Sequence, residues 1–198
     1  MRTHLIGAEG LKTFISSKQC DVDCTLSRLD IDYLPRAQAG EQASEIVEIT
    51  TPESVEHPSA GALITREKNV VLMLKTNAGM PILLYRENPR LCAVVFVASP
   101  GKAKEVFTKT LEKINAIDPI SEPLHVWFGP STCRFCHADR SEGESYDLMG
   151  EAITEIKTLG FPYRMYRDTR CMVCDNQELY SKHLDDENQE VVAGLVMV

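Results

Sequence analysis

Three apolar segments in the middle of the chain constrain its fold more than any other feature. They run over residues 69–74, 81–85 and 91–98, and short stretches containing Gly, Asn or Pro separate them. Consecutive apolar residues in runs this short are typical of strands covered on both faces. We therefore predict that these segments are buried strands covered on both faces.

The segment after the third apolar run has the pattern of a helix. Residues 102–117 place Ala103, Val106, Leu111 and Ile114 on one broad face and Lys and Glu residues on the other. A helix with one apolar face packs that face on the core. We expect it to cover the sheet.

Weaker patterns complete the fold prediction. Leu11, Phe14 and Ile15 follow i, i+3, i+4 spacing, which predicts a short amphipathic helix over residues 7–18. Gly160 is a typical helix stop after a second amphipathic segment. That helix is expected over residues 146–159, and further strands over residues 45–50, 124–128 and 191–198. The order of elements predicts an α/β fold with a mixed central sheet flanked by helices.

Length and charge limit the classes of function. With 198 residues, 43% of them hydrophobic, the chain can form one core, so we expect a single domain over residues 1–198. The net charge of −8 argues against a broad nucleic-acid surface, because phosphate binding needs clustered Lys and Arg. No apolar run approaches the roughly 18 residues of a membrane span. We expect no nucleic-acid or membrane partner.

The cysteine content predicts a reducing compartment. Seven cysteines are an odd number, and the N-terminus has no apolar stretch long enough for a secretion signal. Thiols or metal ligands are then more common than a disulfide framework. We expect a protein of the cytoplasm or an organellar matrix that is not secreted.

Several motifs occur together in one order. Residues 62–65 read ALIT, residues 76–85 read TNAGMPILLY, and residues 92–101 read CAVVFVASPG. These resemble ADALVT, TADCLPILLYDP and VAAVHAGWRG of the YfiH or laccase-domain family. Later stretches are similar to that family's IGPxIxxCCYEV, CTYCDPERFFSYRRD and MAGLIWL, namely Gly129–Ser131 with Cys136, Cys171–Ser181, and Ala193–Leu195. The resemblance covers roughly residues 40–198 and implies the family's α/β fold.

The chain departs from this family where the family carries its chemistry. Members are described as purine nucleoside phosphorylases and adenosine deaminases, and earlier as polyphenol oxidases, with a His, a Cys and a second His around zinc or substrate. The Cys of ADC falls on Gly79, its Asp on Ala78, and the His of HAGW on Val97. No His occupies residues 39–43, where the QVHG turn is expected. The arginine pair after FSY falls on residues 183 and 184, which are His and Leu.

The N-terminal strands with the family's TTRxGG motif have no evident counterpart. We therefore expect a domain that is N-terminally shortened relative to the family.

These departures predict a protein without the family's catalytic residues. Gly79 and Val97 cannot coordinate a metal, ionise or transfer a proton. The leading hypothesis is a non-catalytic binding or assembly subunit with a protein partner or a larger assembly. The alternative is a divergent zinc-dependent purine nucleoside phosphorylase or adenosine deaminase. It would use Cys92 as a relocated nucleophile with His57 or His125 as base, although a lone Cys in an apolar run is more often a core residue.

Four cysteines form two CxxC pairs, Cys133 with Cys136 and Cys171 with Cys174. Two such pairs supply the four thiolates of a closed tetrahedral zinc site. Reduced buried thiols and a redox pair are the alternatives. Cys133 to His137 also matches the CxxCH haem-attachment motif, but c-type attachment takes place in exported or organellar compartments and no export signal is present.

Three arginines alternate with aromatic residues near the second CxxC pair. Arg164, Arg167 and Arg170 lie on a predicted strand that also contains Tyr163 and Tyr166. Such a strand either lines an anion or nucleotide pocket or presents a solvated charged face.

Overall fold

A computed structural model of the chain describes residues 1–40, 45–57, 59–76, 79–99, 101–119, 121–133, 135–136, 147–175, 177–180 and 190–198, the side chains of residues 103 and 104 excepted. The strands are β1 (Arg2–Thr3), β2 (Leu11–Ile15), β3 (Arg36–Ala39), β4 (Glu45–Ile49), β5 (Val55–His57), β6 (Ala60–Thr65), β7 (Val71–Thr76), β8 (Met80–Arg86), β9 (Leu91–Val97), β10 (Leu124–Phe128), β11 (Tyr163–Arg167) and β12 (Val191–Met197). The helical elements are α1 (Val22–Arg28), the π-helical turn η1 (Ala103–Thr108), α2 (Lys109–Ile117) and α3 (Leu148–Leu159).

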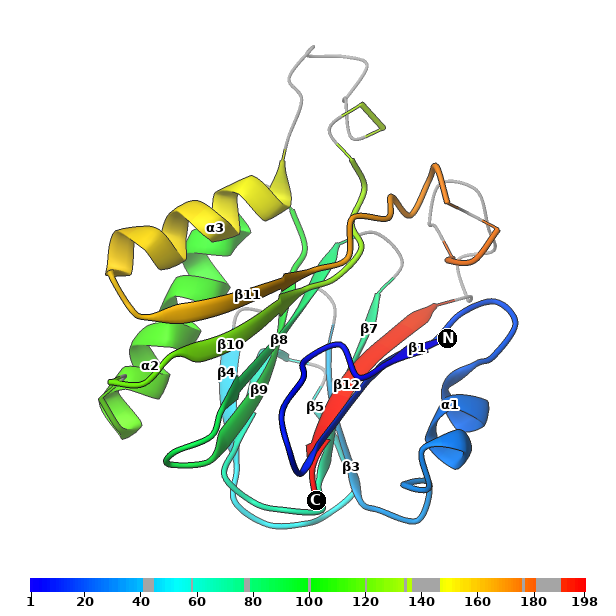
Figure 1. Ribbon diagram of the computed structural model, residues 1–198, viewed down its shortest axis with the longest axis horizontal. Helices are drawn as coiled ribbons and strands as arrows, with labels where there is room; N and C mark the ends of the chain where they lie inside the picture. The colour runs from blue at the N-terminus through cyan, green and yellow to red at the C-terminus, as the bar shows by residue number, and fades with distance from the viewer. Residues whose placement is uncertain are drawn as a thin grey trace.

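The strands form two six-stranded sheets (Figure 1). The first has the order β1-β2-β12-β7-β3-β5, and the second has the order β11-β10-β8-β9-β6-β4. Both are mixed, with parallel pairs such as β3 with β7 and β10 with β11 beside antiparallel neighbours. The predicted α/β class is confirmed, although two sheets take the place of the single central sheet.

The main core lies between the two sheets. On β8, Leu83 and Tyr85 belong to this inner cluster, whereas Ile82 and Leu84 belong to a second cluster on the opposite face. All seven residues of β8 and all seven of β9 are buried. The prediction that the central strands are covered on both faces is therefore confirmed.

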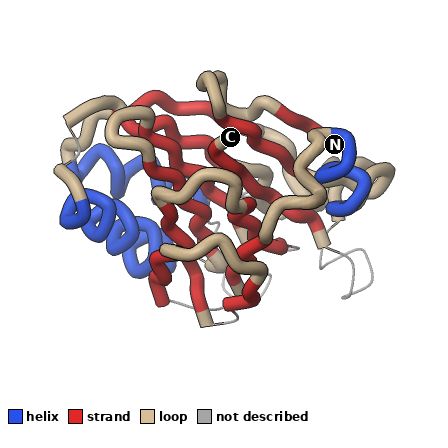
Figure 2. The backbone as a smooth tube through the Cα atoms, turned by 90° about the horizontal axis from the view of Figure 1, so that it is seen from below, coloured by secondary structure: helices blue, strands red, loops and turns tan. Residues whose placement is uncertain are grey.

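Helical elements cover the outer faces of both sheets (Figures 1 and 2). Val106, Leu111 and Ile114 pack in the outer cluster of the second sheet, as predicted, although η1 replaces the first turns of the expected helix. The other predicted helix, α3, ends as expected at Gly160, which has a φ of 71°. On the first sheet, α1 contributes Leu26 to a third cluster. None of the described helices is long and apolar enough to span a membrane.

The helix predicted over residues 7–18 is wrong. Residues 11–15 form β2, which pairs with β12. Leu11 and Ile15 face the inner core, while Phe14 points to the opposite face and packs under α1. A strand that is buried on both faces can carry apolar residues at i, i+3 and i+4, so this spacing alone does not identify a helix. The N-terminal segment thus supplies two strands of the first sheet.

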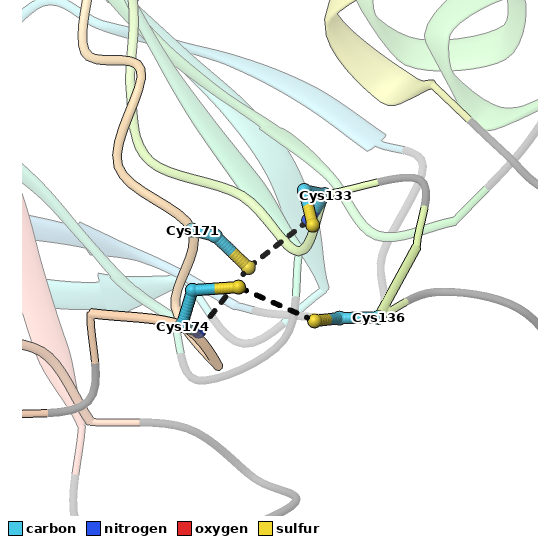
Figure 3. A group of neighbouring side chains, drawn as sticks. All are labelled: Cys133, Cys136, Cys171 and Cys174. Atoms are coloured by element: carbon cyan, nitrogen blue, oxygen red, sulfur yellow. Dashed lines mark hydrogen bonds between the residues drawn. The ribbon is translucent and has the colours of Figure 1, made fainter.

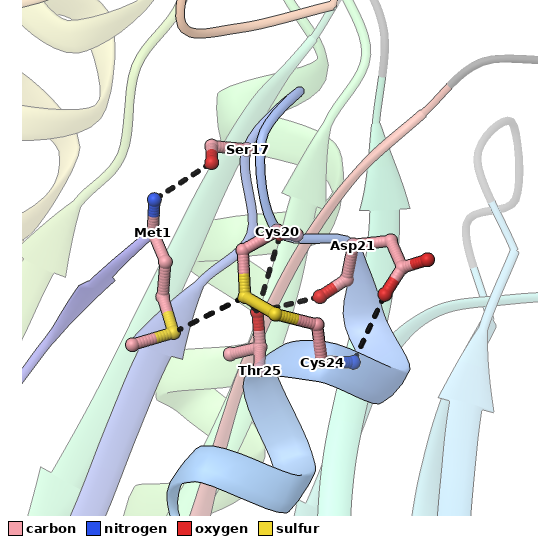
Figure 4. The surroundings of a disulfide bond; sticks show 6 residues. All are labelled: Met1, Ser17, Cys20, Asp21, Cys24 and Thr25. Carbon is pink, nitrogen blue, oxygen red and sulfur yellow. Dashed lines mark hydrogen bonds between the residues drawn. A yellow bond between two sulfur atoms is a disulfide. The ribbon is translucent and has the colours of Figure 1, made fainter.

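A disulfide joins Cys20 to Cys24 at the start of α1 (Figure 4). Asp21 caps this helix by accepting a hydrogen bond from the backbone N–H of Cys24, and the resulting turn brings the two Cα atoms to 5.4 Å. That separation lies in the usual range for disulfides. The expectation that the cysteines are thiols or metal ligands is therefore wrong for this pair.

Gly194 gives a test of the packing between β12 and its neighbouring strands β2 and β7. A Cβ on this β12 residue would lie 2.6 Å from the carbonyl oxygen of Leu72 and 2.6 Å from the ring of Phe14. Gly194→Ala should therefore lower the free energy of unfolding by about 1–3 kcal/mol in urea titrations. Gly7→Ala is the control, because no atom lies within 4 Å of a Cβ placed there. Equal stability of the two variants would contradict the packing described.

Candidate functional site

The two CxxC pairs meet because of a strand–helix–strand unit. β10 and β11 are parallel neighbours, and α3 lies between them in the chain. Parallel strands joined by such a crossover run in the same direction, so their carboxyl ends lie next to each other. A bridge between Ser131 and Cys171 continues the pairing beyond the strands. The loops that follow β10 and β11 are thereby held side by side, and each carries one CxxC pair.

The four sulfur atoms of Cys133, Cys136, Cys171 and Cys174 all lie within 4.8 Å of one another (Figure 3). The Sγ atoms of Cys136 and Cys174 are 3.5 Å apart. A tetrahedral ion with metal–sulfur bonds of about 2.3 Å holds its ligands about 3.8 Å apart. The donor atoms are therefore at the spacing of a four-thiolate metal site. We refer to these residues as the four-cysteine cluster.

Backbone groups favour the thiolate at one member of the four-cysteine cluster. The Sγ atom of Cys171 accepts hydrogen bonds from the backbone N–H groups of Cys133, at 3.2 Å, and Cys174, at 3.4 Å. Burial opposes ionisation, but these donors lower the pKa of Cys171 to about 7. The hydrogen bond with Cys174, together with desolvation, raises the pKa of Cys136 to about 12. The pKa values of these neighbouring thiols are thus shifted in opposite directions. A bound cation removes this difference, because it stabilises the thiolate form of every ligand.

A buried ion pair anchors the loop that carries Cys171 and Cys174. Asp168 is 4% exposed, and Arg170 Nε donates to its Oδ1 at 2.9 Å. Burial raises the pKa of Asp168, but the hydrogen bonds from Arg170 outweigh it and leave that pKa below its usual value. Arg170 also donates to Glu178 at 2.7 Å. Arg170 therefore positions the loop and is not free to bind an external anion.

The structure separates Cys92 from His125, one of the two bases suggested for a relocated nucleophile. Cys92 is fully buried, which raises the pKa of its thiol. Cys92 and His125 lie opposite Tyr85 on its two sides, so β8 separates them by about two strand spacings, or about 10 Å. His125 instead pairs through Nδ1 with the hydroxyl of Tyr166 at 3.0 Å. His57 lies on β5 of the other sheet. The structure therefore keeps His125 away from Cys92.

At Gly79, where the resemblance places the family's Cys, the space that a side chain would need is filled. A Cβ on Gly79 would lie 2.5 Å from Cζ of Phe96 and 2.6 Å from the carbonyl oxygen of Val97. Phe96 itself is 4% exposed and belongs to the inner core. Any side chain at residue 79 would therefore collide with a ring that cannot move into solvent.

The residue that faces Gly79 is Phe96, and Val97 points to the other face of β9. Val97 packs in the outer cluster, beneath the helices. Aligned without a gap, residues 92–101 put Phe96 opposite the His of VAAVHAGWRG. In this alignment the residue opposite that His is therefore Phe96, one position before Val97. Residues 41–43, 78, 137, 183 and 184 of the resemblance lie outside the described residues.

Comparison with known proteins assigns the family. The sequence profile described as "Multi-copper polyphenol oxidoreductase laccase" matches residues 38–141, more than half of the chain. The chain belongs to this family. A comparison with curated proteins gave no match.

Solved structures show that the chain has the fold of other laccase-domain proteins. YlmD from Geobacillus stearothermophilus superposes with a TM-score of 0.83 at 14% identity, over 96% of this chain and 92% of that one. Protein NMB0706 from Neisseria meningitidis superposes with a TM-score of 0.76 at 15% identity, over 96% of this chain and 95% of that one. YfiH from Bacillus licheniformis superposes with a TM-score of 0.78 at 12% identity, over 95% of this chain and 93% of that one. At these identities the similarity concerns the fold.

The residues present do not fit the multi-copper centre that the laccase-domain family name implies. Among the described His, Cys, Asp and Glu residues, the four-cysteine cluster is the group placed to hold a metal, and it offers sulfur alone. Cu(II) prefers nitrogen and oxygen ligands in tetragonal geometry, whereas four tetrahedral thiolates suit zinc or iron–sulfur chemistry. The four-cysteine cluster is thus a candidate metal centre of another kind.

The contact between Gly79 and Phe96 predicts coupled stability effects. Gly79→Cys should lower the free energy of unfolding by about 1–3 kcal/mol, because the new side chain collides with the Phe96 ring. In a Phe96→Leu background the same substitution should cost less, with a coupling of about 1 kcal/mol in a double-mutant cycle followed by urea denaturation. Strictly additive effects would show that the two residues do not compete for the same space.

Proposed function

We propose that the protein is a non-catalytic laccase-domain protein that acts as a binding or assembly subunit. The observation that carries this proposal is the Phe96 ring against Gly79, where the resemblance places the family's His and Cys. Two groups that could exchange a proton and bind a metal are replaced by a ring and a hydrogen atom. The former site is now packed core.

Nothing in the described part of the chain takes over the lost chemistry. Cys92 is buried and β8 separates it from His125, which is held by Tyr166. The four-cysteine cluster is closed, because four protein thiolates fill a tetrahedral ion and leave no position for water or substrate. This arrangement supports a structural ion in preference to a catalytic one.

Zinc is the metal that this proposal assigns to the four-cysteine cluster. The four sulfur atoms belong to two loops that follow β10 and β11, and a bound ion would join these loops. Ligand sets of four thiolates in CxxC pairs are typical of structural zinc sites. Such an ion would stabilise the folded chain, since the ligands are not preformed when it unfolds.

Metal content and stability test the zinc assignment together. Protein purified with zinc should hold about one ion per chain by elemental analysis, and Cys171→Ser should reduce this to near zero and lower Tm. Cys92→Ser is the matched control, because it alters a buried thiol outside the four-cysteine cluster and should keep the ion. Unchanged metal content in Cys171→Ser, or a wild-type Tm that is insensitive to chelation, would refute structural zinc.

A turnover assay tests the non-catalytic role. Zinc-loaded protein should form no product from adenosine or inosine with phosphate, under conditions in which an active member of the family does. The physical reason is that Gly79 and Phe96 can neither coordinate nor transfer a proton. Product formation above background would overturn the proposal, and its loss in Cys92→Ala but not in Cys171→Ser would place a relocated site on β9.

A further inference from the structure

Strand β11 is an edge of the second sheet, and within the described residues its outer side is open. Its one strand partner among the described residues is β10, with which it forms five residue pairs. Arg164, Met165 and Arg167 are exposed, and Met165 reaches 39% at the middle of the strand. An exposed edge of this kind offers backbone groups to another chain.

The hydrogen-bond register identifies which backbone groups face outward. Leu124 N–H donates to the carbonyl of Pro162 at 2.9 Å, and Asp168 N–H donates to the carbonyl of Phe128 at 2.8 Å. In a parallel pair, every second residue of a strand bonds to the same neighbour, so the even-numbered residues from 162 to 168 face β10. The N–H and C=O groups of Tyr163, Met165 and Arg167 consequently point to the open edge.

The edge is positively charged in an otherwise acidic protein. The chain carries a net charge of −8, yet Arg164 and Arg167 lie on this one five-residue strand. Within the part of the chain that the structure describes, neither side chain forms an ion pair, in contrast to Arg170 with Asp168. The local field therefore favours an anionic partner.

A pocket lies beside the same edge. It has a volume of about 240 Å³ and is lined by Arg2, Leu5, Trp127, Tyr166, Arg167 and Asp168. Trp127 and Tyr166 are cross-strand neighbours on β10 and β11, so a strand added to the edge would pass directly beside the pocket. Alternate side chains of that strand would point to the same face as Tyr166.

We propose that β11 docks an extended acidic segment of a partner protein, which adds to the second sheet as a further strand and places an apolar side chain in the pocket beside Trp127. Main-chain hydrogen bonds supply affinity in such complexes, and pockets for alternate side chains supply specificity. This inference rests on the proposed role as a binding subunit and names the class of partner. Charged residues also protect edge strands from aggregation, and that role alone predicts no binding.

Fluorescence anisotropy with synthetic peptides tests the docking. The probe is an end-capped peptide of alternating Glu and Val, compared with the same peptide carrying Lys for Glu. The full-length protein should bind the acidic peptide at least about tenfold more tightly, and the binding should weaken with salt. Equal affinity for both peptides, or no binding of either, would overturn the proposal.

Variants separate the charge from the backbone pairing. The double variant Arg164→Glu with Arg167→Glu should weaken binding by at least about tenfold, whereas Arg66→Glu, a single charge reversal near the opposite edge of the sheet, should have little effect. Met165→Pro removes an outward N–H without touching the β10 ladder, and should also weaken binding. A folded Met165→Pro protein that binds as wild type would show that no strand is added.

Hydrogen exchange gives a readout that does not depend on any variant. The amides of Tyr163, Met165 and Arg167 should gain protection when the acidic peptide binds, because they become donors to the added strand. Protection elsewhere only would overturn the proposed site. Either result leaves the turnover assay unchanged, so failure of this docking site and failure of the non-catalytic role are distinguishable.

Discussion

Burial of β8 and β9 on both faces is the constraint on which the rest of the structure depends. Their inward side chains form the core between the sheets, and η1, α2 and α3 pack on their outward side chains. Two adjacent strands with every residue buried leave no room for an added side chain at their ends. The contact between Phe96 and Gly79 lies at such an end, which explains why residue 79 has no space for a side chain.

Sequence patterns predicted the elements better than their arrangement. Continuous apolar runs located the central strands because complete burial selects such residues. The same reasoning failed at β2, where Leu11 and Ile15 face one side and Phe14 the other, so that burial on two faces imitated helical spacing. The division into two sheets was not predictable, because strands of either sheet have the same local pattern. Which strands pair is decided by long-range contacts such as β12 with β2 and β7.

For the candidate site, the local sequence motifs were informative, but they did not tell on which face of a sheet each side chain lies. The spacing within each CxxC pair identified the four ligands, but their meeting depends on the parallel pairing of β10 with β11. The lost histidine was placed on Val97, and a shift of one residue on a strand exchanges the two faces of a sheet. Only the contact with Gly79 shows that the Phe96 ring occupies the space that a side chain at residue 79 would need. The Cys20–Cys24 disulfide escaped sequence analysis because it depends on the turn that starts α1.

The four-cysteine cluster and the proposed docking edge lie together in the unit formed by β10, α3 and β11. β11 is attached to its sheet through β10, and its outer side is open in the described structure. Such a strand is held by its pairing with β10 and by the contacts at its ends. The four-cysteine cluster and the Asp168–Arg170 pair both lie at the end where β11 leaves the sheet. We infer that a metal in the four-cysteine cluster would fix the edge at which a partner strand is proposed to add. Structural zinc and a binding role are then connected, because the ion would preorganise the docking edge without taking part in chemistry.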